Sequence, residues 1–304
     1  MTQVAPMTQV APDPRADEQG SGRETARLDH HRTPRRRTAA VLALGACVAL
    51  LAACATTNPG TPRTPGTPEE PGPTPALTGA LTVFAAASLQ ETFDDLTRLF
   101  ASQHPGVDVR PVTYDGSSTL ATQLVEGASA DVLATADEAT MAVVADAGLL
   151  AADPEAFATN TLILAVAPGN PLGVTSLDDL AAVSQEGARV VLCAQEVPCG
   201  AASEQVLADV DVTVASREQN VTAVLAKVAS GEADAGLVYR TDIARADGQV
   251  VGVDVPEAAD VVNTYPIAVL ADAPGGDAVA QAFVDLVTSA PGLAVLGAAG
   301  FGPP

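Results

Sequence analysis

The sequence predicts an α/β protein with mainly parallel sheets, and three observations predict it. From Leu81 onward, short runs rich in β-branched residues alternate with amphipathic stretches, which is typical of parallel sheets covered by helices. Hydrophobic residues make up 47% of the 304 residues, as expected for a chain that folds around a core. Aromatic residues make up only 3%, so that core must be built mainly from Ala, Val and Leu.

The alternating pattern places the elements along the chain. Strands are predicted where β-branched and other apolar residues run together, at residues 81–86, 107–113, 131–135, 161–167, 189–193, 211–214, 234–238, 249–253 and 265–270. Helices are predicted in the amphipathic stretches, at residues 89–103, 118–127, 137–147, 176–183, 200–208, 218–230 and 276–289. In the first helix, Phe93, Leu96, Leu99 and Phe100 recur at helical spacing.

The N-terminal region, residues 1–53, has the features of an extension and a signal peptide. Three consecutive arginines precede an apolar run at residues 39–53, which is too short to span a bilayer comfortably. The run ends in Leu-Ala-Ala before Cys54. This sequence resembles the lipobox of bacterial lipoproteins, which implies cleavage before Cys54 and lipid on its sulfur. An uncleaved signal anchor with an incidental cysteine is the alternative.

Residues 54–76 form the predicted linker. After Cys54 this stretch is rich in Pro, Thr and Gly, a composition that gives a stiff, extended chain without a core. Such a spacer holds a folded domain a short distance from a membrane. The sequence therefore predicts an extracytoplasmic protein that is lipid-anchored to the outer face of the cell membrane.

The charge of the chain limits its partners. Of 15 basic and 37 acidic residues, seven basic and five acidic residues precede Cys54. The remaining chain is strongly acidic, and such a surface repels nucleic acid and anionic lipid. We expect no nucleic-acid partner, and any anionic ligand must be held by local contacts.

Several strand-to-helix junctions have small or hydroxyl side chains, and ligands of α/β sheets bind where such helices begin. The junctions are at residues 85–88, 116–119, 197–201 and 219–221. A helix N-terminus holds an anion through its unpaired N–H groups without Lys or Arg, and hydroxyl groups add donors. The alternative is that these residues only cap helices, as the spacing of Ser88 and Glu91 suggests.

Four stretches, FAAASL, GSSTLATQLVEGASADVLATAD, LAKVASGEADAGLVY and YPIAV, together look like the periplasmic molybdate-binding proteins of ABC transporters. The resemblance extends from about Leu81 to the end. It implies a two-lobed periplasmic-binding-protein fold with mostly parallel sheets flanked by helices. An oxyanion binds in the inter-lobe cleft of such proteins. The resemblance places lobe I at residues 77–166 and 248–304 and lobe II at residues 167–247.

The resemblance also implies the ligand-binding residues. Ser88 and Ser117 donate by side chain and backbone, Cys199 and Val221 by backbone N–H, and Tyr239 by its phenol. For Tyr239, the alternative is an aromatic residue that only packs at the hinge. Molybdenum enters solely as the bound oxyanion, and no cofactor is expected.

The chain departs from the family pattern in two places. Cys193 and Cys199 flank a short turn, and two cysteines this close outside the cytoplasm are candidates for a disulfide. Free thiols are the alternative. Asp115 precedes Gly116, and its carboxylate would repel a dianion unless it points outward.

The five matched positions also limit the ligand. Phosphate is usually protonated near neutral pH and needs an acceptor for its proton, but none of these positions supplies a carboxylate. A fully deprotonated dianion fits better, so the sequence predicts binding of molybdate and tungstate. The alternative is a binding protein of the same fold for sulfate or another small anion.

The remaining expectations concern the class of protein. The chain contains no HExxH, GxSxG or Walker pattern, and His104 is the only histidine after the predicted signal peptide. An enzymatic function is therefore poorly supported. An adhesive or structural role is a further alternative, and it predicts a protein without a closed cleft. We expect a monomer that delivers its ligand to the permease and ATPase subunits of an ABC importer.

Overall fold

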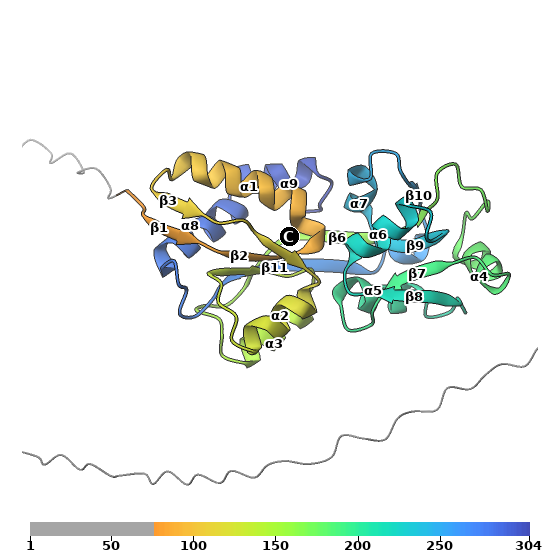
Figure 1. Ribbon diagram of the computed structural model, residues 1–304, viewed down its shortest axis with the longest axis horizontal. Helices are drawn as coiled ribbons and strands as arrows, with labels where there is room; N and C mark the ends of the chain where they lie inside the picture. The colour runs from red at the N-terminus through yellow and green to blue at the C-terminus, as the bar shows by residue number, and fades with distance from the viewer. Residues whose placement is uncertain (1–75) are drawn as a thin grey trace, which may run out of the picture. The chain divides into compact units, whose positions relative to one another are not determined.

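The computed structural model describes residues 76–304, and all of them belong to one compact unit. The predicted signal peptide, the predicted lipidation site at Cys54 and the linker up to residue 75 lie outside the described residues. Within the described unit, two α/β lobes are joined by two long strands that run between them (Figure 1).

The described residues form eleven strands and nine α-helices. The strands are β1 (Gly79–Leu81), β2 (Val83–Ala86), β3 (Val107–Val109), β4 (Thr113–Asp115), β5 (Val132–Ala134), β6 (Glu155–Val166), β7 (Val190–Cys193), β8 (Val214–Glu218), β9 (Ala235–Tyr239), β10 (Val251–Val253) and β11 (Val262–Val269). The helices are α1 (Gln90–Gln103), α2 (Ser117–Val125), α3 (Glu138–Asp146), α4 (Leu177–Gln185), α5 (Pro198–Val206), α6 (Val221–Ala229), α7 (Arg240–Arg245), α8 (Asp277–Thr288) and α9 (Ala290–Ala298). Two short 3-10 helices, η1 (Ala87–Leu89) and η2 (Pro256–Ala258), complete the set.

The predicted helices are all present within a few residues of their expected bounds, but some predicted strands differ. The strand predicted at residues 107–113 divides into β3 and β4, and Pro111, which cannot donate to a ladder, lies between them. The strand predicted at residues 211–214 begins only at Val214, because its position is set by pairing with β7. Non-local pairing therefore overrides the local pattern here.

The sequence prediction misses α7 and α9. Helix α7 is only six residues long and mostly polar, whereas α9 is apolar on most sides and follows α8 directly, with Ser289 as its N-cap. No single helix among residues 76–304 is long and apolar enough to cross a membrane. The pair α8 and α9 passes that test of length and composition only together, with a bend of 57°.

The main sheet extends through both lobes in the order β4-β2-β5-β11-β6-β9-β7-β8, and β10 pairs with β6. Its outer parts are parallel: β2 pairs with β4 and β5, and β7 pairs with β8 and β9. Its centre is antiparallel, because β6 and β11 cross between the lobes in opposite directions. The predicted α/β class with mainly parallel pairing is confirmed.

The core of the first lobe follows the predicted helical spacing. Phe93, Leu96 and Phe100 of α1 are fully buried. Phe93 packs against Phe157 of β6 and Phe283 of α8, with ring centroids 5.8 Å and 6.0 Å away. These contacts hold α1 over the sheet and fix the position of the short turn before it, where Ser88 lies.

The lobe boundaries stay a prediction, although the strand pairing bears on them. Strand β10 pairs with Leu164–Val166 of β6, on the edge of β6 opposite to β9. This pairing favours a second lobe that continues through β10 and returns along β11. The chain then returns to the first lobe along β11, which lies after residue 248, the boundary that the sequence suggested.

Candidate functional site

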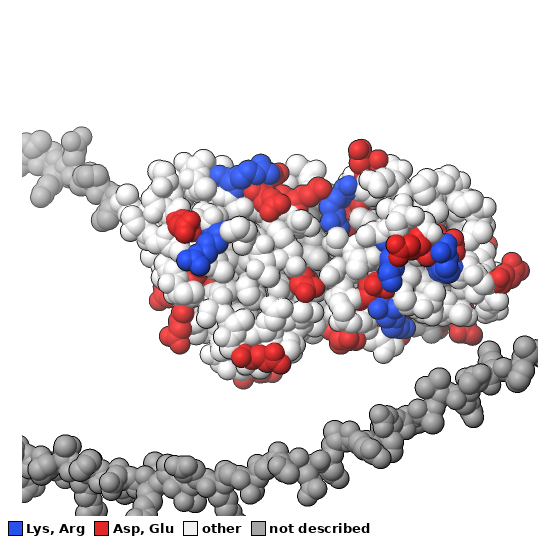
Figure 2. Space-filling view, viewed as in Figure 1, with Lys and Arg blue, Asp and Glu red and all other residues white. Residues whose placement is uncertain are grey.

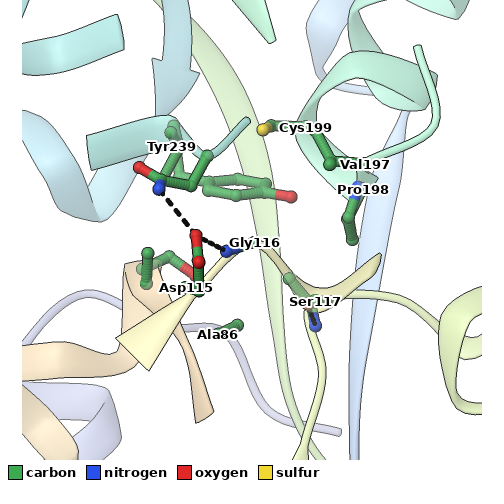
Figure 3. A pocket seen from close by; sticks show the side chains of 13 residues that line it. Ala86, Asp115, Gly116, Ser117, Val197, Pro198, Cys199 and Tyr239 are labelled. Carbon is green, nitrogen blue, oxygen red and sulfur yellow. Dashed lines mark hydrogen bonds between the residues drawn. The ribbon is translucent and has the colours of Figure 1, made fainter. Parts of the chain in front are cut away.

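A small cavity lies where the two lobes meet (Figure 3). The cavity volume, counted as the space open to the centre of a water-sized sphere, is about 20 Å³. One water needs roughly 10–15 Å³, so the cavity admits one compact occupant somewhat larger than water. Its lining residues are Ala86, Ala87, Ser88, Asp115, Gly116, Ser117, Ala136, Val197, Pro198, Cys199, Asn220, Val221 and Tyr239. All five residues that the sequence predicted as ligands therefore line one cavity.

The strand ends explain why these residues meet. Strands β2, β4 and β9 end at Ala86, Asp115 and Tyr239, and each end is followed by a helical turn at the cavity. Strands β2 and β4 are parallel, so the turns after them lie at one edge of the sheet. Strand β9 runs in the opposite direction in the second lobe, so its end meets theirs from the other side of the cavity. Ala86 and Ala87 have small side chains, which leave the backbone accessible from the cavity.

Ser88 is not the helix cap that its spacing to Glu91 suggested. The N-cap of α1 is Leu89, without a side-chain cap hydrogen bond. The Oγ of Ser88 lies 3.1 Å from the hydroxyl oxygen of Tyr265 on β11. The Ser88 side chain is therefore held by a residue distant in sequence, beside the cavity.

Ser117 is the first residue of α2, and its side chain does not cap that helix either. Its Oγ accepts a hydrogen bond from the N–H of Ala136, at 3.0 Å. This bond uses a lone pair of Oγ and leaves the hydroxyl proton for another acceptor. Ser117 is 1% exposed and lines the cavity, so its proton is available to an acceptor there.

Cys199 and Val221 lie in the first turns of α5 and α6. N–H groups in a first helical turn have no helical partner, and within residues 76–304 these two donate no hydrogen bond. Cys193, the last residue of β7, forms a disulfide with Cys199. The disulfide joins the strand end to the helix start and restrains the turn that carries the Cys199 N–H.

Tyr239 contributes a third hydroxyl. The side chain is 1% exposed, and its oxygen has no hydrogen-bond partner among the described residues. Burial, first of all, and the neighbouring Tyr265 raise the pKa of Tyr239 well above its ordinary value. The phenol is therefore a neutral donor. Figure 3 shows its ring extending into the site between Gly116 and Cys199.

Basic side chains do not take part in this site. None lines the cavity, and each of the seven Lys and Arg residues in the described part of the chain forms an ion pair with Asp or Glu. On the face that Figure 2 shows, the basic groups are distributed over both lobes and lie next to acidic ones. An anion in the cavity would be held by neutral donors alone.

Asp115 is the one charged residue in the lining, and it is tied to neighbouring donors. Its Oδ1 accepts hydrogen bonds from the N–H of Gly116 at 2.7 Å and from Nδ2 of Asn220 at 3.0 Å (Figure 3). Asn220 belongs to the second lobe and also caps α6 through Ala223. The bond between Asp115 and Asn220 therefore links the two lobes beside the cavity.

Gly116 and Asn220 are site residues that the sequence analysis did not assign. A Cβ on Gly116 would lie 2.1 Å from the backbone oxygen of Gln219 in the other lobe, so only glycine allows the lobes to approach this closely. Nearby, the hydroxyl of Ser118 donates to the backbone oxygen of Glu196, also across the boundary. The local signals were the glycine and asparagine at helix starts, but their contacts are non-local.

Two lobes joined by crossing strands, with a donor-lined cavity between them, define a two-lobed solute-binding protein. The chain belongs to the bacterial extracellular solute-binding proteins, and the family model matches residues 81–302. The molybdate-binding protein ModA of Mycobacterium tuberculosis H37Rv is 44% identical over 259 residues, covering 84% of this chain and 94% of the relative. ModA of Escherichia coli K12 is 30% identical over 202 residues, covering 63% and 77%.

Solved structures share the fold. The periplasmic molybdate-binding protein of Azotobacter vinelandii aligns with a TM-score of 0.61 at 22% identity, covering 74% of this chain and 99% of that structure. The sulfate-binding protein SubI of Mycobacterium tuberculosis aligns with a TM-score of 0.64 at 19% identity, covering 74% and 87%. At these identities the likeness establishes the two-lobed architecture alone.

The unpartnered hydroxyl of Tyr239 generates the first prediction. We expect Tyr239→Phe to weaken the binding of molybdate, the oxyanion for which the relatives are named, by about tenfold or more, because a hydrogen bond to a charged group is lost. The unliganded protein should be no less stable, since the removed hydroxyl had no partner. Calorimetric titration and thermal unfolding measure the two effects.

Tyr114→Phe is the matched control, because the hydroxyl of Tyr114 bonds the Asp94 carboxylate at 2.8 Å, outside the cavity lining. It should lower stability and leave molybdate affinity unchanged. Equal affinities of Tyr239→Phe and the unmodified protein would contradict the assigned role of Tyr239.

The close approach at Gly116 generates the second prediction. Gly116→Ala should weaken molybdate binding at least about tenfold, because the added Cβ meets backbone rather than a flexible side chain and the lobes cannot close. The φ of −57° suits any residue, so the lobes themselves should remain folded. Small-angle scattering with molybdate should show a particle that stays expanded.

Gly297→Ala provides the matched control for this variant. A Cβ at Gly297 would meet open space within helix α9, so affinity and compaction should match those of the unmodified protein. Normal compaction of Gly116→Ala on adding molybdate would contradict the proposed closure.

The disulfide generates the third prediction. Replacing Cys193 and Cys199 together by alanine should lower the free energy of unfolding by about 2 kcal/mol, the value expected for so short a loop. Molybdate affinity should also fall, because the Cys199 N–H is less restrained. A reducing agent should bring the unmodified protein to the stability of this variant, as urea denaturation would measure. Unchanged stability of the double variant would contradict a stabilising disulfide.

Proposed function

We propose that this protein binds molybdate and tungstate outside the cytoplasm and delivers them to an ABC importer. The observation that carries the proposal is the cavity itself: three buried hydroxyl groups and two helix-start N–H groups face a space without a basic side chain. The relatives at 44% and 30% identity, which are molybdate-binding proteins by name, support this ligand.

The donors favour a fully deprotonated dianion. Ser117 accepts from a backbone N–H and Tyr239 has no partner among the described residues, so both protons are available to a ligand. A protonated phosphate needs an acceptor for its proton, and the lining offers only one carboxylate, Asp115, whose Oδ1 already accepts two hydrogen bonds and whose Oδ2 alone stays free among the described residues. Sulfate has the same charge and shape as molybdate and is the competing ligand, which only a difference in size distinguishes.

The two lobes give the binding protein its working cycle. Hydrogen bonds between Asp115 and Asn220 and between Ser118 and Glu196 join the two lobes, and we expect them to break when the lobes separate. An anion that bonds to both lobes stabilises the closed form, because a ligand shifts a conformational equilibrium by its differential affinity. The transporter's permease and ATPase subunits would then reopen the lobes and take the ion.

The N-terminal features complete the proposal. The Leu-Ala-Ala-Cys sequence before residue 55 supports lipid attachment at Cys54, and the Pro-rich linker supports a tethered domain at the outer face of the membrane. In this role the protein acts as a monomer, carries no cofactor and catalyses no reaction. The ligand passes to the importer unchanged.

A calorimetric panel tests the proposed ligand, and this is the fourth prediction. Molybdate and tungstate should bind with one site per chain, and sulfate should bind more weakly because it is the smaller ion. Phosphate should bind most weakly, because Oδ2 of Asp115 is the only free carboxylate oxygen in the described lining that could accept its proton. Chloride at matched ionic strength is the control for non-specific anion effects. Binding of sulfate alone, or of none of these oxyanions, would overturn the proposal.

A further inference from the structure

Tyr265 lies at the centre of the described unit but outside the cavity lining. It belongs to the crossing strand β11 and is 0% exposed. Its ring packs edge-on against Tyr239, Phe301 and Phe157, with centroids 5.9, 5.4 and 6.3 Å away. Its position and contacts therefore place it behind two of the proposed ligand-binding residues, Ser88 and Tyr239.

The hydrogen bond between Tyr265 and Ser88 has a direction that the surroundings determine. Either oxygen could donate across the 3.1 Å distance. Among the described residues, Ser88 is the one partner with hydrogen-bond geometry to the Tyr265 hydroxyl, and Tyr239 and Asn160 are its other polar neighbours. If Ser88 donated, the Tyr265 proton would be buried without an acceptor, which protein interiors avoid. The Tyr265 hydroxyl is therefore the donor.

This direction decides what Ser88 presents to the cavity. Once its Oγ accepts from Tyr265, its own proton needs a different acceptor. Within the described residues, Oγ makes no second hydrogen bond, and Ser88 lines the cavity. The Ser88 proton is thereby left for a ligand oxygen.

We propose that Tyr265 is a positioning residue for the ligand: by donating to Ser88, it fixes the Ser88 hydroxyl as a donor toward the bound oxyanion. This inference rests on the proposed oxyanion-binding function. The same ring packs against Tyr239 from the other lobe, so Tyr265 supports one donor of each lobe. In a buried site, the successive hydrogen bonds of such a chain strengthen one another.

The test is a double-mutant cycle, which forms the fifth prediction. Tyr265→Phe keeps the ring and removes the donor, and it should weaken molybdate binding about fivefold. In a Ser88→Ala background the same substitution should cause no further loss, because its effect passes through Ser88. In a Ser117→Ala background the fivefold loss should remain, since Ser117 is oriented by Ala136 instead.

The matched backgrounds separate positioning from general structural damage. Damage from Tyr265→Phe would lower affinity equally in the Ser88→Ala and Ser117→Ala backgrounds, and that result would overturn the inference. Unchanged affinity of Tyr265→Phe in the otherwise unmodified protein would overturn it as well. If the unmodified protein does not bind molybdate at all, the proposed function itself is wrong. That outcome differs from a loss of the Tyr265 effect in a protein that binds molybdate, so the two failures are distinguishable. Tyr114→Phe again controls for loss of a tyrosine hydroxyl outside the cavity lining.

Discussion

The site depends on one constraint: the negative charge of a dianion must be balanced without a basic side chain. The acidic chain has all seven of its described Lys and Arg residues in ion pairs, so the charge of a ligand must be balanced by oriented N–H and O–H dipoles. Such dipoles are effective only at short range and in a dry site. Converging helix starts, small alanine side chains and buried hydroxyl groups meet this requirement together.

A cage of donors has a consequence for the empty protein. Tyr239 has a buried hydroxyl without a partner in the closed form of the described chain, and burying an unpaired polar group is unfavourable. Opening the lobes lets water reach such groups, whereas an anion satisfies them in the closed form. The same donors therefore favour an open empty protein and a closed loaded one, which couples binding to lobe closure.

Local sequence predicted seven of the nine α-helices in the described residues and several junctions at which they begin, because a helix start and its flanking small residues are local features. The five proposed ligands came from the resemblance to the family. Local spacing also allowed Ser88 to be a helix cap, and it could not show the actual partner, Tyr265, which lies 177 residues away. It also could not assign Asn220 or Gly116, whose roles depend on contacts between the lobes. The sequence thus indicated where the donor groups lie along the chain. The orientation of each donor could be assigned only from its non-local hydrogen-bond partners in the structure.

Asp115 shows how such non-local contacts change the meaning of a residue. From the sequence, a carboxylate beside an anion site is a liability. In the structure its Oδ1 accepts from Gly116 in its own lobe and from Asn220 in the other. Because the second bond requires closed lobes, Asp115 stabilises closure even though its charge opposes the ligand. When the lobes separate, that bond is lost and the unfavourable charge remains, so Asp115 favours release of the anion from the open form.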